Sequence, residues 1–317
     1  MTLATTDRYA DIPGPAPQRL DDVPGWLTTT DNFLFRWFLE RQNRLEHPGD
    51  LLELGVFQGR SAIHIGSYRK PDERFTVCDL FDHARDEESI RPGARKAYAN
   101  LTQAIFERNY LAFHDELPAI VRGLTETIVD HVAPGTCRFA HIDASHMYEH
   151  VRGDLIAVRS LLRTDGIVVF DDYRTEHCPG TAAAVWEAMA TEGLRVVCVS
   201  ANKFYGTWGN ATPMQDDLIE HVAGRSDHRC DLQRVMGQRL VRLAKIAAPK
   251  PAKSLVPVQV ADGAAGALLA QSREVLDAAA RVLNDMSRPT PRQAWKRIAV
   301  AVLPPVVTDA VRHRSGR

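Results

Sequence analysis

Short apolar segments alternate with segments of helical spacing between residues 51 and 208, and this alternation constrains the fold more than any other feature. It is typical of a parallel sheet covered by helices on both faces. The expected strands are 51–56, 75–81, 138–143, 166–172, 195–200 and 203–208, with a weaker candidate at 110–114. The expected helices begin near Asp31, a plausible N-cap, and continue at 61–69, 94–108, 117–132, 147–162, 181–192 and 215–247.

The last two expected strands are separated by only Ala201 and Asn202. That turn is too short for a crossover helix, so these strands should form an antiparallel hairpin. The predicted fold class is therefore α/β, a doubly wound and mostly parallel sheet with an antiparallel terminal hairpin.

The flanking segments differ in composition from the alternating region. We predict an irregular N-terminal arm over residues 1–30, a sheet domain over 31–212 and a helical C-terminal extension over 213–317, with a Pro/Ala/Gly-rich linker near 248–266. The basic tail after residue 288 could be a solvated helix, a dimer contact that makes a homo-oligomer, or a cover over a bound acceptor. Its apolar run could also lie weakly on a membrane surface.

Composition excludes several classes of protein. The 39 Lys and Arg residues nearly balance 40 Asp and Glu residues, so no strong net charge draws the protein to nucleic acid. The five scattered cysteines form no CxxC pair, which argues against a zinc knuckle or a disulfide framework and favours reduced thiols in the cytoplasm. No apolar run is long enough to suggest a signal peptide or a transmembrane segment.

A glycine-containing turn, E-L-G-V-F-Q-G-R-S-A, follows the first expected strand. Gly55 and Gly59 would let the backbone pass close to a ligand, and the helix N-terminus that follows favours a carboxylate. The alternative is an ordinary tight turn. Asp79 ends the second expected strand, where an acidic side chain can accept the hydroxyls of a ribose, and Asp82 is a nearby competitor for that role.

Acidic residues and a histidine end the next two strong strands. Asp143 and His146 follow one strand, and Asp171 and Asp172 follow the other, so all four should face the crevice where such sheets bind ligands. Three converging carboxylates without basic partners in these motifs would repel one another, and a Mg²⁺ or Mn²⁺ ion would resolve that repulsion. Asp171 and Asp172 could instead cap a loop, and His146 could be a helix N-terminal residue that donates a hydrogen bond.

Three motifs carry a resemblance to a known family: E-L-G-V-F-Q-G-R-S-A, I-D-A-S-H-M-Y-E-H-V-R-G-D-L and L-R-T-D-G-I-V-V-F-D-D-Y. Residues 51–208 resemble the metal-dependent macrocin and mycinamicin sugar O-methyltransferases, which are class I S-adenosylmethionine-dependent enzymes with a seven-stranded sheet. The cephalosporin hydroxylase group is a near neighbour. Those enzymes carry extra N-terminal structure, whereas the addition here is C-terminal.

The resemblance implies roles for particular residues. It makes Asp143, Asp171 and Asp172 metal ligands and His146 the general base. The residues that it places in the cofactor site are Glu53, Gly55, Gly59, Ser61 and Asp79. Tyr173 and His177 follow the metal carboxylates and are candidates for the acceptor site.

The predicted function is Mg²⁺-assisted methyl transfer from S-adenosylmethionine to a hydroxyl of a sugar or glycosylated metabolite. The acceptor would be a small molecule or an oligosaccharide. A metal ion that binds a sugar hydroxyl lowers the pKa of that hydroxyl, and a histidine can then take its proton near neutral pH. The alternatives are a hydroxylase-like enzyme or a non-catalytic assembly protein on the same scaffold. A non-heme iron site needs two histidines with one carboxylate, and Asp143, Asp171 and Asp172 offer the wrong set.

Overall fold

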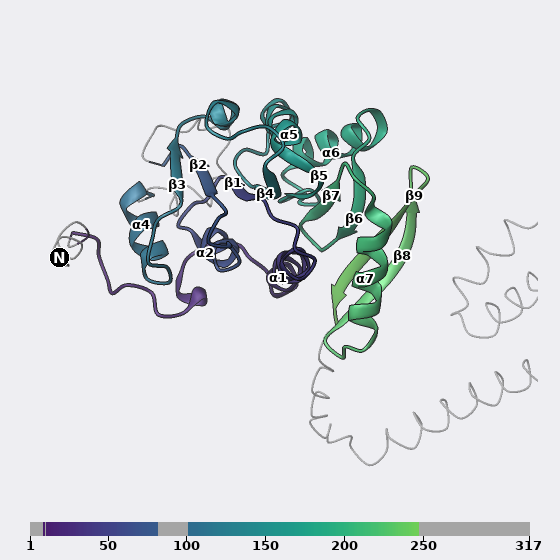
Figure 1. The fold of residues 1–317 in the computed structure, drawn as a ribbon, viewed down its shortest axis with the longest axis horizontal. Helices are drawn as coiled ribbons and strands as arrows, with labels where there is room; N and C mark the ends of the chain where they lie inside the picture. Colours follow the sequence, from purple (N-terminus) through teal and green to yellow (C-terminus); the bar gives the residue numbers. More distant parts are fainter. Residues whose placement is uncertain (1–8, 10, 82–100, 247–317) are drawn as a thin grey trace, which may run out of the picture. The chain divides into compact units, whose positions relative to one another are not determined.

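The computed structural model describes residue 9, residues 11–81 and residues 101–246 (Figure 1). Contacts divide the chain into two units, residues 1–248 and residues 249–317. The second unit lies outside the described residues. It holds most of the predicted linker and the basic tail, so the oligomer and membrane contacts predicted for that tail lie outside them too. The same holds for Asp82 and the first part of the helix predicted over 94–108.

The described part of the chain forms one mixed sheet of nine strands, in the order β3-β2-β1-β4-β5-β7-β6-β9-β8. The first seven strands are β1 (Asp50–Leu54), β2 (Phe75–Asp79), β3 (Ala119–Arg122), β4 (Cys137–Ile142), β5 (Leu162–Phe170), β6 (Arg195–Val199) and β7 (Phe204–Thr207). Neighbours from β3 to β5 pair in parallel, and β7 runs antiparallel between β5 and β6. The predicted doubly wound sheet with an antiparallel hairpin is confirmed.

Helices cover both faces of this sheet (Figure 1). One face packs against α1 (Thr29–Arg44), α2 (Arg60–Gly66), α4 (Gln103–Leu111) and α7 (Ala211–Ala223), and the other against α5 (Tyr148–Leu161) and α6 (Pro179–Thr191). Successive residues of a strand point to opposite faces, so Ile167 and Val169 enter the first core while Val168 and Phe170 enter the second. The strands therefore read as continuous apolar runs in the sequence.

Helix α1 begins earlier than predicted. Its N-cap is Thr28, whose hydroxyl accepts a hydrogen bond from the backbone N–H of Asp31. Asp31 is fully buried in the first turn, and its carboxylate also accepts a 2.9 Å hydrogen bond from the Tyr205 hydroxyl. This contact fixes α1 to strand β7, and the prediction that Asp31 is the cap was wrong.

Four other sequence predictions, on two strands or helices near β3, on the segment after β7 and on the number of strands, were wrong. The third strand is β3, not residues 110–114, and η3 (Thr125–Asp130) follows it, so 117–132 is not one helix. The predicted helix over 215–247 is α7 followed by the hairpin of β8 (His228–Val235) and β9 (Gln238–Lys245), which makes the sheet nine-stranded and not seven-stranded. The turn residues Met236 and Gly237 both have positive φ, as the tight turns that suit β-hairpins require.

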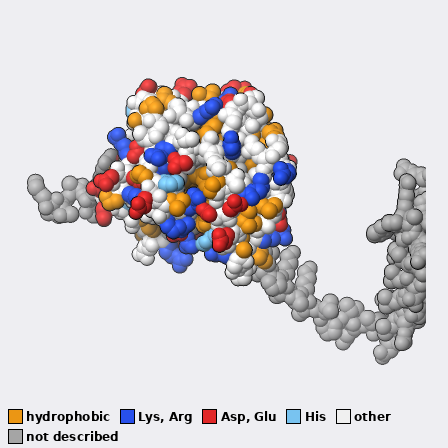
Figure 2. Space-filling model, turned by 45° about the vertical axis from the view of Figure 1, so that its right-hand side comes forward, with side chains coloured by type: hydrophobic (Ala, Val, Ile, Leu, Met, Phe, Trp, Pro, Cys, Tyr) orange, Lys and Arg blue, Asp and Glu red, His pale blue; other side chains and the backbone are white. Residues whose placement is uncertain are grey.

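The surface agrees with the balanced composition. On the face shown in Figure 2, basic and acidic side chains are interspersed. Among the described helices, none is long and apolar enough to cross a membrane.

Candidate active site

The glycine turn after β1 packs directly on the end of β4. Gly55 has a φ of +80°, and a Cβ atom there would overlap the backbone carbonyl of Asp143. Gly59, with a φ of +97°, is the N-cap of α2, and a Cβ atom there would meet the ring of Phe106 at 3.0 Å. Glycine at position 55 is therefore required by the approach of two strand ends.

Asp79 ends β2 and holds this turn in place. Its carboxylate accepts backbone hydrogen bonds from Val56 at 2.8 Å, Phe57 at 3.0 Å and Phe81 at 2.9 Å. The side chain is buried. Asp79 is thus a positioning residue for the turn in this structure, and its predicted contact with a ribose stays a prediction.

A row of four buried ionisable side chains runs across the sheet beneath the site. Glu53 Oε1 lies 2.7 Å from His141 Nδ1, across the paired strands β1 and β4. His141 Nε2 lies 3.1 Å from Lys203 Nζ, and the Lys203 ammonium forms an ion pair with Asp171 Oδ2. Each of these four residues is at most 6% exposed. The row links the end of β1, in the predicted cofactor site, to the end of β5.

Lys203 was missed by the sequence analysis. It immediately precedes β7, and the antiparallel pairing of Phe170 with Phe204 brings it opposite Asp171. Burial acts to lower the pKa of Lys203, but Asp171 and Asp143 outweigh burial and raise it. The carboxylates were expected to converge without basic partners in their own motifs, and the order of strands supplies a basic partner from outside those motifs.

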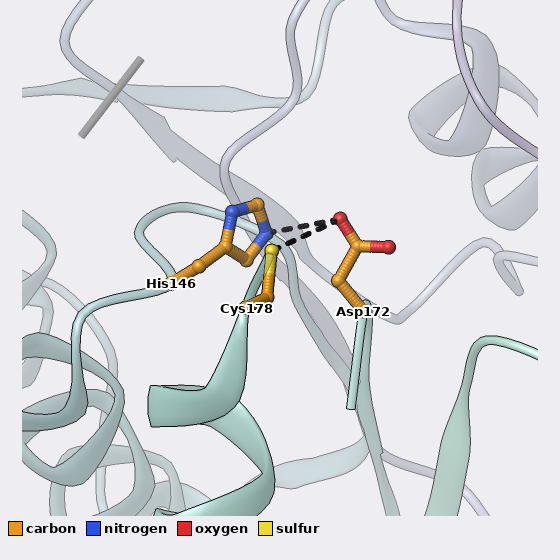
Figure 3. Close-up of side chains that lie close together, drawn as sticks. All are labelled: His146, Asp172 and Cys178. Carbon is orange, nitrogen blue, oxygen red and sulfur yellow. Dashed lines mark hydrogen bonds and ion pairs between the residues drawn. The ribbon is translucent and has the colours of Figure 1, made fainter. Parts of the chain in front are cut away.

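His146 lies between two of the predicted metal ligands. Its Nε2 atom is 3.7 Å from Asp143 Oδ1 and 3.6 Å from Asp172 Oδ2. Cys178, the N-cap of α6, adds a thiol 3.8 Å from the same oxygen of Asp172 (Figure 3). The loops after β4 and β5 thus bring an imidazole, a thiol and two carboxylates to one edge of the sheet.

The charges at this edge favour a protonated His146. Burial acts to lower the pKa of His146, but its interactions with Asp143 and Cys178 outweigh burial and raise that pKa to about 10. Burial acts to raise the pKa of Asp143, yet His146, Lys203 and His141 together hold it well below its ordinary value. In this arrangement the imidazolium and the Asp143 carboxylate compensate each other.

The three predicted metal carboxylates do not form one group. Among the described residues, the ligand atoms that lie close enough to share an ion fall into two sets: His141 with Asp143 and Asp171, and His146 with Asp172 and Cys178. Asp171 also has both oxygens engaged, one by Lys203 and the other by the backbone N–H of Asp172 at 2.7 Å.

The remaining site candidates lie in different surroundings. Tyr173 is buried among aromatic side chains, with its ring centroid 5.7 Å from Phe204, and burial raises its pKa to about 12. It packs in the core, and its predicted contact with the acceptor stays a prediction. His177 is exposed, and Ser61 is half-buried in the first turn of α2.

Residues 52–173 match the family model described as a methyltransferase domain. No curated protein matches the chain.

Similar solved structures include the O-methyltransferase NovP, with 22% identity, a TM-score of 0.47, and coverage of 56% of this chain and 79% of that chain. The calicheamicin methyltransferase CalS11 has 21% identity and a TM-score of 0.43, with 58% of this chain and 82% of that chain covered. MycE, in complex with Mg, SAH and mycinamycin VI, has 16% identity and a TM-score of 0.38, with 62% of this chain and 56% of that chain covered.

The family match begins in β1 and ends just after Asp172. It contains the glycine turn, Asp79, Asp143, His146 and Asp171. Over this segment, residues 52–173, the chain is similar to the methyltransferase-domain family.

Proposed function

We propose that the protein is an S-adenosylmethionine-dependent O-methyltransferase, assisted by Mg²⁺, that acts on a hydroxyl of a sugar or glycosylated metabolite. One observation carries this proposal: Gly55 packs on the backbone of Asp143 and Ala144. The predicted cofactor turn and the Asp143–His146–Asp172 cluster therefore adjoin at the carboxyl edge of the sheet. Ligands of open α/β sheets bind at that edge, and methyl transfer requires cofactor and acceptor in contact there.

The chemistry divides between cofactor and protein. The acceptor oxygen attacks the methyl carbon, the carbon–sulfur bond breaks with its electron pair going to sulfur, and the acceptor proton leaves. The turn held by Asp79 would bind the cofactor, and the N-terminus of α2 would favour its carboxylate. The cluster around His146 would orient the acceptor and take its proton.

His146 can accept that proton only when it is neutral. The Asp143 carboxylate and the Cys178 thiol beside it raise its pKa to about 10, although burial opposes them. Positive charge brought next to Asp143 would lower the pKa of His146 toward neutrality, since it offsets the effect of that carboxylate. Both the sulfonium of the cofactor and a divalent cation carry such charge.

The fit to Mg²⁺ differs among the three predicted ligands. Asp143 and Asp172 have partly exposed carboxylates, at 28% and 25%, with oxygens that face the same imidazole. To hold one Mg²⁺ together, these two carboxylates would have to move closer to each other, because they belong to different potential ligand sets. Mg²⁺ prefers carboxylate oxygens, lowers the pKa of a hydroxyl that it binds and keeps several waters. Asp171 would join them only in competition with Lys203.

Calorimetric titration with S-adenosylhomocysteine tests the cofactor site. We expect saturable binding by the protein and weaker binding by Asp79→Asn, because the amide cannot accept all three backbone hydrogen bonds of the turn. Asp50→Asn is the matched control: Asp50 also accepts a backbone hydrogen bond, from Arg74 at 2.8 Å, but at the start of β1. Absence of binding to the folded protein would contradict the methyltransferase proposal and favour the assembly-protein alternative.

A further inference from the structure

Cys178, His146 and Asp172 come from the connections after β4 and β5 and meet at one point. His146 lies in the loop after β4, Asp172 in the turn after β5, and Cys178 at the start of α6 (Figure 3). One potential ligand atom from each residue lies within 4.8 Å of the other two. The proposed methyl transfer assigns no role to the thiol.

The spacing of these atoms suits tetrahedral coordination. Zinc bound to sulfur at about 2.3 Å and to nitrogen or oxygen at about 2.0–2.1 Å gives ligand separations of roughly 3.3–3.6 Å. The observed separations are 3.6 Å from His146 Nε2 to Asp172 Oδ2 and 3.8 Å from Cys178 Sγ to that oxygen. These two separations need to change by only a few tenths of an ångström for an ion to bind, and the third, between Cys178 and His146, lies within 4.8 Å.

The groups around the cluster leave it open to a cation. His146 Nε2 is buried and has no hydrogen-bond partner among the described residues. In the other potential ligand set, His141 and Asp171 already contact the Lys203 ammonium. In the Cys178 set the His146 imidazole, which can lose its proton to a metal ion, stands beside the carboxylate in place of a lysine ammonium. That carboxylate is held in place by a 2.6 Å hydrogen bond from the Thr175 hydroxyl to its second oxygen.

We propose that Cys178, His146 and Asp172 form a three-ligand binding site for a thiophilic divalent cation such as Zn²⁺ or Co²⁺. Thiolate and imidazole ligands select such ions over Mg²⁺, and binding releases the thiol proton of Cys178 and the imidazolium proton of His146 to solvent. Three protein ligands leave a fourth position open to water or to an acceptor. A consequence rests on the proposed function: Zn²⁺ there occupies His146 and Asp172, and so inhibits Mg²⁺-assisted methyl transfer.

Cobalt titration of the full-length, reduced protein tests the site without any assay of turnover. A Co²⁺–thiolate bond gives a near-ultraviolet charge-transfer band, which we expect in the wild type and which Zn²⁺ should bleach. We expect Cys178→Ser to lose the band and Cys230→Ser to keep it, since Cys230 lies on β8, outside the cluster. Zn²⁺ affinity by calorimetry should fall in Cys178→Ser by more than the roughly 10- to 100-fold that loss of an outer partner costs.

A second variant guards against misfolding of the first. Asp172→Asn keeps a residue type that tolerates the observed φ of 52°, and it should weaken Co²⁺ binding while the thiolate band remains at higher metal concentration. The proposal is overturned if the wild type gives no band, if Cys178→Ser retains it, or if Cys230→Ser abolishes it.

The inhibitory consequence has a separate test. With Mg²⁺ and an accepted substrate, micromolar Zn²⁺ should inhibit the wild type and the Cys230→Ser variant equally. Equal sensitivity in Cys178→Ser would contradict inhibition through this site. Failure of the methyltransferase proposal would appear instead as absence of S-adenosylhomocysteine binding, with the cobalt band unchanged.

Discussion

Lys203 Nζ lies 3.1 Å from His141 Nε2, inside the sheet domain and beneath the ends of β4 and β5. The same ammonium pairs with Asp171, while His141 contacts Glu53 on the opposite side of its ring. A buried cation therefore stands where the sequence analysis predicted only a metal. This ammonium compensates the negative charge of Asp171 at the end of β5, next to the Asp143–His146–Asp172 cluster, before any ligand binds.

Replacing Lys203 with methionine should destabilise the protein strongly. The substitution leaves the buried Asp171 carboxylate without its partner, and breaking a buried pair in this way costs about 3–5 kcal/mol. Urea unfolding should show this loss, and the double variant Lys203→Met/Asp171→Asn should recover a large part of it. Equal stability of the single and double variants would contradict the pairing.

The exposed pair of Arg36 and Glu40 provides the control for this measurement. Its atoms lie 3.7 Å apart, with side chains 50% and 51% exposed. Removing it with Arg36→Ala should change the free energy of unfolding by less than about 1 kcal/mol, since solvent screens such pairs.

Gly55→Ala should prevent normal folding of the glycine turn. The added methyl group overlaps the Asp143 carbonyl, and neither strand end can move without breaking the sheet. Gly135→Ala is a matched control, because Gly135 also has a positive φ, +67°, but nothing lies within 4 Å of its Cβ position. We expect the control to lose about 1–2 kcal/mol from backbone strain, and Gly55→Ala to lose substantially more in thermal or urea unfolding. Similar losses in both variants would contradict a steric role for Gly55.

The sequence predicted the parts of the fold that local pattern determines. Strands buried on both faces read as apolar runs, which identified β1, β2 and β4 to β7, and the two-residue connection identified the terminal hairpin. Strand β3 has only four residues, too few to show a period, and β8 is half exposed, so its polar residues resembled a helix face.

The candidate site could be predicted only in part, for a different physical reason. Asp143, His146 and Asp172 follow strand ends, and the general rule for parallel sheets places them at one edge. Lys203 and Cys178 reach that edge through the sheet order and the start of α6, which no spacing in the sequence reveals. Without those two residues, the charge balance of the site could not be derived.

Acidification should destabilise the protein through His64. Burial lowers the pKa of His64 from 6.5 to about 4, despite a hydrogen bond to the Asn32 carbonyl. Between pH 6.5 and pH 4 this histidine is protonated in the unfolded chain but neutral in the folded state. Its contribution to the free energy of unfolding is therefore fully present above pH 6.5 and is lost as the pH decreases toward 4. The loss attributable to this residue is about 2–3 kcal/mol.

The variant His64→Phe isolates this contribution from other titrating groups. Its aromatic ring can keep the contacts with Phe35 and Tyr68, although the hydrogen bond is lost. Urea unfolding at several pH values between 6.5 and 4 should show a smaller decrease for the variant than for the wild type. Parallel curves for the two proteins would show that His64 does not carry the effect.

His146→Gln should separate binding from turnover. Glutamine fills similar space but cannot act as a base near neutral pH, so methyl transfer should fall by about 100-fold or more. Binding of S-adenosylhomocysteine should change little, because the turn held by Asp79 remains intact. The control is His150→Gln, whose native ring contacts the Ser145 hydroxyl at 2.9 Å on the exposed side of the same segment. Normal turnover in His146→Gln would remove His146 from the role of base.

Removal of divalent cations should stop methyl transfer and leave the fold intact. Lys203 already compensates Asp171, so chelation removes no cation that the buried part of the site needs for stability. In excess EDTA we expect turnover to disappear, the unfolding midpoint to stay constant, and S-adenosylhomocysteine still to bind. Added Mg²⁺ should restore turnover, whereas added Zn²⁺ should not, because it is drawn to the Cys178 thiol and occupies His146. Undiminished turnover in EDTA would contradict the role of the metal. The cofactor site and the base are tested separately, by Asp79→Asn and His146→Gln.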